Sequence, residues 1–291
     1  MRSRSDPCSP PAGWTRRRWC GAALGLPLWA AATGARAQPD SHRLARIRER
    51  GSLIVGLYQD MPPFHADGRG IDMALGQALA QQMGLGFRPL PFQAGENMGD
   101  DLRNMVWKGH YLGWGPADVL LHVPLERALM AANPQVQVVA PYYRERVLIA
   151  WAADAAASVE SLADLRGLRV AVCGQSLAGW LLAGAEGGAL QGNLVTAFAD
   201  GVAAAQSLRE GRADAVAGLA SELESVLAHD ARFRLQPLPS IRFPREGWAV
   251  GCAVRADADD LAQALQAAML ALQSDGRLAT LFRQSNVDWR L

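Results

Sequence analysis

A Gly-Gln-Ser turn, Gly174 to Ser176, lies between an apolar run and a helical stretch that begins at Leu177. At the start of a helix the backbone N–H groups are free, and together with the Ser176 hydroxyl they can hold a carboxylate or another anion. The same hydroxyl can instead cap the helix, a role that contributes about 1 kcal/mol to helix stability. The sequence leaves both roles open for Gly174, Gln175 and Ser176.

Signals for catalysis or metal binding are weak. An enzyme on this chain would need an acid–base pair, and the candidates His110, His122 and Glu126 form no motif. The sequence has no nucleophile elbow and no phosphate loop, and neither Cys173 nor Cys252 lies in a C-x-x-C or near a spaced histidine. We therefore predict a protein that is not an enzyme and that holds no metal and no cofactor.

Two groups of aromatic residues are candidates for contact with a ligand or a partner. Tyr58 and Phe64 flank a Pro-Pro loop and could stack on a ligand, or serve as core or rim residues. Residues 107–115 hold a second aromatic group, which could line a binding surface or fold onto its own domain.

The remaining pattern is an alternation of predicted strands and helices. Strands are predicted over residues 52–57, 87–92, 118–123, 147–152, 168–173, 194–198, 213–217 and 248–254. Helices are predicted over residues 71–83, 97–108, 161–165, from 177 onward, and over 202–209, 219–228 and 257–273. This alternation predicts an α/β fold with two lobes and mostly parallel sheets flanked by helices.

The N-terminal segment, residues 1–37, has the features of a secretory signal peptide. Arginines precede a short apolar stretch, and the stretch ends in the A-x-A sequence Ala35-Arg36-Ala37. Arg16 and Arg17 resemble the twin arginines of a Tat signal, although a basic Sec signal remains an alternative. The sequence predicts export to the periplasm and a mature chain that begins at Gln38.

Composition and charge fit an exported globular protein. The chain has 291 residues and a formal net charge of +1, and hydrophobic residues make up 50% of it, enough to bury a core. Removal of residues 1–37 leaves 23 basic and 27 acidic residues, and this negative balance argues against nucleic-acid binding. Cys173 and Cys252 would remain in an oxidising compartment, where we expect two free thiols rather than a bridge.

Four segments resemble periplasmic solute-binding proteins of the polar amino acid type, family 3. The segments are Val55-Gly56 through Pro62-Pro63-Phe64 to Gly70-Ile71-Asp72, Asp118–Val123 with Pro141-Tyr142-Tyr143, Ser161–Val172, and Gly211-Arg212-Ala213-Asp214-Ala215. In that order they span most of the mature chain.

The resemblance implies two lobes that close on a ligand about a hinge. Residues 38–145 plus 249–291 would form lobe one, and residues 146–248 lobe two. Ligands of open α/β sheets bind beyond the carboxyl ends of strands. The implied ligand-binding residues are Tyr58, Phe64, His122, Arg127, Gly174, Gln175 and Ser176.

Two departures from the family pattern bear on the ligand. Arg127 resembles a family arginine that binds a carboxylate of the ligand. It follows Asp118 at a shorter spacing than in the family, however, and the Thr or Ser that accompanies the family arginine is absent here. Position 219 is Leu where amino-acid binders place an Asp for the ammonium group. A buried ammonium without a carboxylate is costly, so we expect a neutral or anionic solute.

The sequence supports three functions, with the first favoured. The first is a monomeric receptor that delivers a small polar or anionic solute to an ABC permease. The second is an accessory protein of a periplasmic quinoprotein (PQQ) methanol or alcohol dehydrogenase or its cytochrome, because Asp118–Pro124 and Ala140–Arg144 resemble such proteins. The third is a dehydratase-type enzyme on the same fold. Neighbouring permease or dehydrogenase genes would separate the first two.

Overall fold

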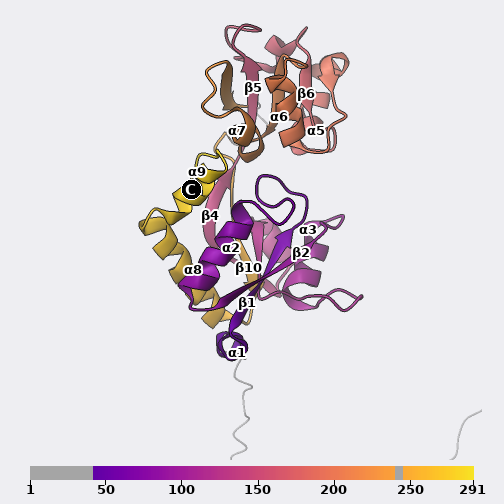
Figure 1. Cartoon of the computed structure of the whole chain (residues 1–291). Helices are drawn as coiled ribbons and strands as arrows, with labels where there is room; N and C mark the ends of the chain where they lie inside the picture. Colours follow the sequence, from indigo (N-terminus) through magenta and orange to yellow (C-terminus); the bar gives the residue numbers. More distant parts are fainter. Residues whose placement is uncertain (1–41, 240–244) are drawn as a thin grey trace, which may run out of the picture. The chain divides into compact units, whose positions relative to one another are not determined.

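The computed structural model describes residues 42–239 and 245–291, which form two β-sheets flanked by helices (Figure 1). The predicted signal peptide, residues 1–37, lies outside the described residues. Within the described ranges, no helix combines the length and the apolar character needed to cross a membrane.

The first sheet has the strand order β2-β1-β3-β10-β4. Its strands are β1 (Ser52–Tyr58), β2 (Gly86–Phe92), β3 (Val119–Pro124), β4 (Val136–Glu145) and β10 (Trp248–Arg255). Strand β1 runs parallel to both β2 and β3, and β10 runs antiparallel to both β3 and β4. Strands from both ends of the described residues therefore belong to one sheet.

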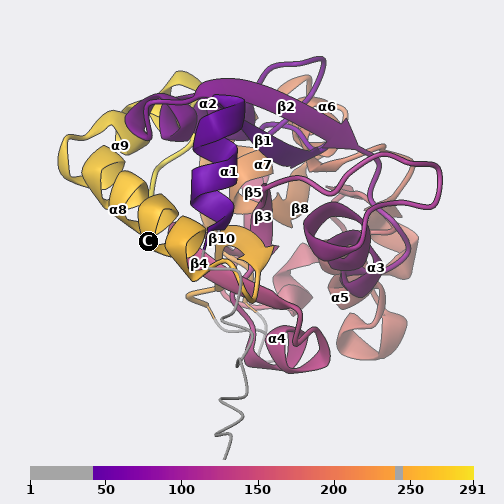
Figure 2. The same cartoon turned by 90° about the horizontal axis from the view of Figure 1, so that it is seen from below.

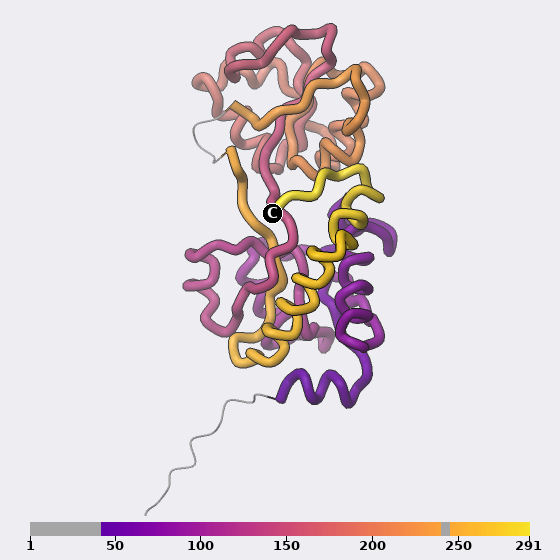
Figure 3. Tube along the Cα trace, turned by 90° about the vertical axis from the view of Figure 1, so that its left-hand side faces the viewer, coloured from indigo at the N-terminus to yellow at the C-terminus, as the bar shows by residue number. Residues whose placement is uncertain are grey.

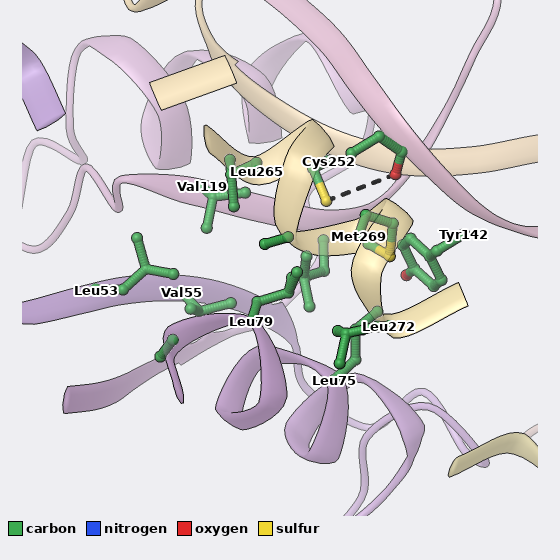
Figure 4. Close-up of a cluster of buried hydrophobic side chains, with 14 of the residues drawn as sticks. Leu53, Val55, Leu75, Leu79, Val119, Tyr142, Cys252, Leu265, Met269 and Leu272 are labelled. Atoms are coloured by element: carbon green, nitrogen blue, oxygen red, sulfur yellow. Dashed lines mark hydrogen bonds between the residues drawn. The ribbon is translucent and has the colours of Figure 1, made fainter. Parts of the chain in front are cut away.

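One face of the first sheet is covered by four helices. They are α1 (Arg43–Arg50), α2 (Ile71–Gln82), α8 (Asp259–Ser274) and α9 (Arg277–Gln284), and Figure 2 shows them grouped on one side of the sheet. Alternate residues of β1, such as Leu53 and Val55, point into this core with Leu75 and Leu79 of α2 (Figure 4). Each fully buried leucine contributes about 1.5–3 kcal/mol.

The opposite face is covered by shorter segments. They are α3 (Met98–Leu102), the π-helical turn η1 (Arg103–Trp107) and α4 (Arg127–Ala132). The side chain of Asn97 caps α3 by accepting a hydrogen bond from the Asp100 backbone at 3.0 Å. The helix predicted over residues 97–108 thus exists as α3 continued by one wider turn.

The second sheet repeats the pattern of the first, with the order β7-β6-β8-β5-β9. Its strands are β5 (Val147–Ala152), β6 (Val170–Val172), β7 (Leu194–Val195), β8 (Ala215–Leu219) and β9 (Phe233–Pro237). One face packs against α5 (Leu177–Ala183) and the turns η2 (Leu162–Leu165) and η3 (Ala185–Gly188), with η4 (Gln191–Asn193) leading into β7. The other face packs against α6 (Gly201–Arg209) and α7 (Ala220–Leu227).

The two-lobe α/β fold is confirmed, but the sheets are mixed rather than mostly parallel. In each sheet two pairings are parallel and two are antiparallel. The reason is that the chain passes between the sheets twice: β4 leads directly into β5, and β10 returns beside β4 (Figure 3). Strands β5 and β10, with which the chain enters each sheet from the other, run antiparallel to their neighbours. A sequence pattern of consecutive strand–helix units predicts only parallel neighbours and cannot predict these two strands.

Candidate functional site

Tyr58 lies at the carboxyl end of β1 and is buried. Its ring packs on Phe92 with a centroid separation of 4.7 Å, and its hydroxyl contacts the Met98 sulfur at 2.9 Å. Burial, together with the nearby Asp101 carboxylate, raises the pKa of Tyr58. Of the roles open to Tyr58, the structure favours that of a core residue.

Phe64 is also a core residue, with 2% of its surface exposed. The Asp72 backbone N–H donates to the Phe64 carbonyl at 2.9 Å, so the Pro-Pro loop is attached to the first turn of α2. The Phe64 ring packs edge-on against the His122 imidazole, with centroids 4.0 Å apart, and against Phe282 of α9. The structure thus brings two of the predicted site residues, Phe64 and His122, into contact.

His122 belongs to a polar cluster near the carboxyl end of β3. Its Nδ1 lies 3.6 Å from Asp72 Oδ2 and 3.4 Å from the Tyr142 hydroxyl. The Tyr142 hydroxyl donates to Asp72 Oδ1 at 2.7 Å, and burial raises the pKa of Tyr142. Asp72 and Tyr142 were not among the predicted site residues, because only tertiary pairing brings α2 and β4 to β3.

Arg127 is the first residue of α4 and is exposed. The preceding Glu126 is also exposed, and its side chain makes no capping hydrogen bond. Arg127 is therefore accessible to solvent, and the structure gives no contact that assigns it to the site.

The Gly174–Ser176 turn follows β6 and begins α5, as predicted. The Ser176 hydroxyl accepts from the Gly179 backbone at 3.1 Å and donates to the Cys173 carbonyl at 2.7 Å. Gln175 is exposed. The hydroxyl thus has one donor and one acceptor partner within the protein, which is the geometry of the capping role.

Glu222, on the first turn of α7, is a polar group that the sequence analysis missed. One carboxylate oxygen accepts from the Gly201 backbone at 3.1 Å, and the other accepts from the Leu219 backbone at 2.9 Å. A carboxylate therefore lies beside the position where an Asp was expected and Leu219 stands. Burial raises the pKa of Glu222 to about 7, with the nearby acids Glu145 and Asp200 acting in the same direction.

His110 lies in the aromatic loop, which we define as residues 107–116. Its ring stacks on Trp114 with centroids 4.1 Å apart, and the backbone N–H of His110 donates to the Trp114 carbonyl. The loop is thereby closed on itself, and it leaves Tyr111 87% and Leu112 68% exposed. His110 is a structural part of this loop.

Cysteine, histidine and acidic side chains are the usual protein ligands of metal ions. Among the residues that the structure describes, no group of three or more His, Cys, Asp or Glu side chains is placed to hold a metal ion. Cys173 and Cys252 are free thiols, and Cys252 is buried, where its Sγ faces the Ala140 carbonyl at 3.9 Å (Figure 4). Burial raises the pKa of the Cys252 thiol.

Comparison with known proteins identifies the fold. No protein-family model matches the chain, and no curated protein matches it. Among solved structures, it is similar to an ancestral cationic amino acid solute-binding protein, with a TM-score of 0.64, 21% identity and coverage of 83% of this chain and 98% of that one. It is also similar to the unliganded, open L-cystine solute receptor of Neisseria gonorrhoeae, with a TM-score of 0.57, 20% identity and coverage of 85% and 98%.

A third similar structure is the VFT2 domain of Bordetella pertussis BvgS, with a TM-score of 0.54, 22% identity and coverage of 85% and 97%. The chain therefore has the two-lobe fold of the family 3 solute-binding proteins. Similarity at this level of identity establishes the fold, and the same fold occurs both in solute receptors and in a domain of BvgS.

Proposed function

We propose that this chain is a periplasmic solute-binding protein that captures a small polar or anionic solute between its two lobes for an ABC transporter. The observation that carries the proposal is the repeated topology: two sheets of the same strand order, joined by two passes of the chain. Loops at the carboxyl ends of strands in both sheets can then reach one solute. The protein would work as a monomer, exported through its N-terminal segment by the Tat route.

The proposed solute contacts come from both sheets. His122 and Arg127 would contribute from the end of β3, and Gly174, Gln175 and Ser176 from the end of β6. Tyr58 and Phe64 are both buried, so they would hold the loop between β1 and α2 in place by packing in the core beneath it. The boundaries proposed for the lobes remain 38–145 plus 249–291 and 146–248.

A thermal-shift screen of the mature protein tests the proposal. A solute at about 100 times its dissociation constant stabilises the folded state by about 2.7 kcal/mol. For a chain of this size, that corresponds to a rise in melting temperature of roughly 5–10 °C. The screen should compare amino acids with their deaminated acid analogues, dicarboxylates and small alcohols. We expect a response to an acid without an ammonium group; the absence of any response would contradict the receptor function.

The second candidate is an accessory protein that docks on a periplasmic quinoprotein dehydrogenase or its cytochrome. The observation in its favour is the aromatic loop, which is held closed by the His110–Trp114 contacts and presents Tyr111 and Leu112 to solvent. A co-purification experiment with wild-type protein and a Tyr111→Ser, Leu112→Ser variant tests it. Loss of a dehydrogenase or cytochrome partner in the variant would support the accessory role. A dehydratase-type activity has the least support, because the similar structures named above are a solute-binding protein, a receptor and a BvgS domain.

A further inference from the structure

The cluster of Asp72, His122 and Tyr142 holds a carboxylate in the interior of the protein. Only 1% of the Asp72 surface is exposed, and its two oxygens face the Tyr142 hydroxyl and the His122 Nδ1. An ionised carboxylate at such a position is costly unless a positive charge compensates it. Of the two contacts described for Asp72, only the imidazole can supply that charge.

Three other titratable groups lie near the Asp72–His122 pair: the acid Glu145, the phenol of Tyr142 and the thiol of Cys252. Glu145, at the end of β4, is close enough for its charge to interact with that of His122. Tyr142, on β4, and Cys252, on β10, are buried and have raised pKa values, so both stay protonated near neutral pH. Asp72 of α2 is therefore the acidic side chain that His122 contacts, and Glu145 of β4 lies further away, with burial raising its pKa.

The backbone fixes where the ring of His122 points. His122 has a φ of +63°, a left-handed conformation that is uncommon for a residue other than glycine. It lies in a bulge of β3. Leu120 and Val123 are three positions apart on β3, but their partners Ala253 and Gly251 are only two positions apart on β10. Bulges redirect side chains and are common beside functional sites. Here the bulge places the imidazole between Asp72 and the edge of the Phe64 ring.

We propose that His122 is the anion anchor of the solute site. Asp72 holds the imidazolium through Nδ1, Tyr142 orients the Asp72 carboxylate, and the His122 Nε2–H donates to a carboxylate group of the solute. The side chain of His122 is 12% exposed, so one edge of the ring reaches the surface. The inference rests on the proposed receptor function and adds two properties to it: the solute carries a carboxylate, and its affinity falls as His122 loses its proton.

The first measurement needs no ligand. In a protein with labelled histidines, NMR assigns the His122 ring signals with a His122→Gln variant and compares them between the wild type and Asp72→Asn. We expect Asp72→Asn to shift the ring-nitrogen signals of His122, which lies 3.6 Å from the Asp72 carboxylate, and to leave those of exposed His42 unchanged. Unchanged His122 signals in Asp72→Asn would show that Asp72 does not hold the ring.

The second measurement uses lactate, succinate and benzoate as probes, by calorimetry at about pH 5.5 and about pH 9, on either side of the ordinary histidine pKa of about 6.5. We expect at least one of them to bind the wild type roughly tenfold more weakly at the higher pH, and His122→Gln to lose binding to a similar extent at the lower pH. His42→Gln, which changes an exposed histidine at the start of α1, is the matched control.

The outcomes separate the inference from the proposed function. A solute that binds equally well at both pH values and to His122→Gln would overturn the anion anchor and leave the receptor function intact. If no probe and no screened solute binds, both fail. Circular dichroism establishes that each variant is folded, and the pH comparison on wild-type protein decides the question even if a variant is not.

Discussion

Ionisation of Glu222 should lower the stability of the fold. Burial raises the pKa of this carboxyl from an ordinary value of 4.5 to about 7 in the folded protein. Since the folded-state pKa is the higher one, the folded protein prefers the protonated carboxyl. The stabilising contribution is therefore fully present below the unfolded pKa of about 4.5 and is lost as the pH rises through about 7.

The size of the effect follows from proton linkage. Between about pH 5 and about pH 8, these two pKa values lower the free energy of unfolding by about 2.5 kcal/mol. The side chain is partly accessible to solvent, so we expect a measured change of about 1–2.5 kcal/mol. The free energy of unfolding falls because the carboxylate is fully hydrated in the unfolded chain, whereas burial in the folded protein removes part of that hydration.

The assay is urea denaturation of the wild type and of Glu222→Gln at both pH values. The Gln oxygen can replace only one of the two carboxylate oxygens that accept from Gly201 and Leu219, so the variant should lose about 1 kcal/mol at low pH. At high pH the variant should equal or exceed the wild type in stability. Glu96→Gln, at an exposed position, is the control and should show no such crossover. A wild-type-minus-variant difference that stays constant from low to high pH would refute the reasoning.

Three further predictions concern a thiol, a cap and a glycine. In the unreduced, folded protein, a thiol reagent should modify partly exposed Cys173 quickly and buried Cys252 only on unfolding, and two thiols should be counted after denaturation; a count of zero would show a bridge. Ser176→Ala should cost about 1 kcal/mol in urea denaturation, as should Asp200→Ala at the cap of α6, and a much larger loss of solute affinity in Ser176→Ala alone would assign that hydroxyl to the ligand. Gly251→Ala should cost about 1–3 kcal/mol, because its new Cβ would lie 2.6 Å from the Val139 carbonyl oxygen, whereas Gly192→Ala meets nothing within 4 Å and should be neutral.

The elements that the sequence predicts well are those with one dominant signal. Strand β1 alternates between two cores, and α2 begins after Gly70 and carries apolar residues at helical spacing. Strand β4 was missed because it contains Pro141, which argues against a central strand. The structure places β4 at the edge of its sheet, where the missing N–H of Pro141 is tolerated. The helices α1 and α9 were missed because each is only eight residues long and buries only two residues, so few positions mark its apolar face.

The site was harder to predict because its contacts join residues far apart in the sequence. Asp72 and Tyr142 are 70 positions apart and meet through one hydrogen bond. The roles left open for Tyr58, Phe64 and Ser176 depended on burial and on hydrogen-bond partners, which a sequence alone does not contain. In each of these cases the structure favours the packing or capping role.

The same reasoning explains why the resemblance to family 3 predicted the fold and not the solute. In the Pro-Pro-Phe loop, Phe64 packs in the core, and the Asp72 that follows binds Tyr142 of the Pro-Tyr-Tyr segment. In the second lobe, Asp164 accepts hydrogen bonds from Glu160 and Ser161, and Asp214 accepts from Arg169.

These recognisable segments are therefore the contacts that hold loops and strands together, and proteins with different ligands can share them. If the chain binds a solute as proposed, specificity would reside in the residues at the strand ends that the segments do not determine. Two such residues are His122, which lies beside Asp72, and Glu222, which accepts hydrogen bonds from two backbone N–H groups. Burial raises the pKa of the Glu222 carboxyl to about 7, so the stability of the fold should change with pH near neutrality through this group.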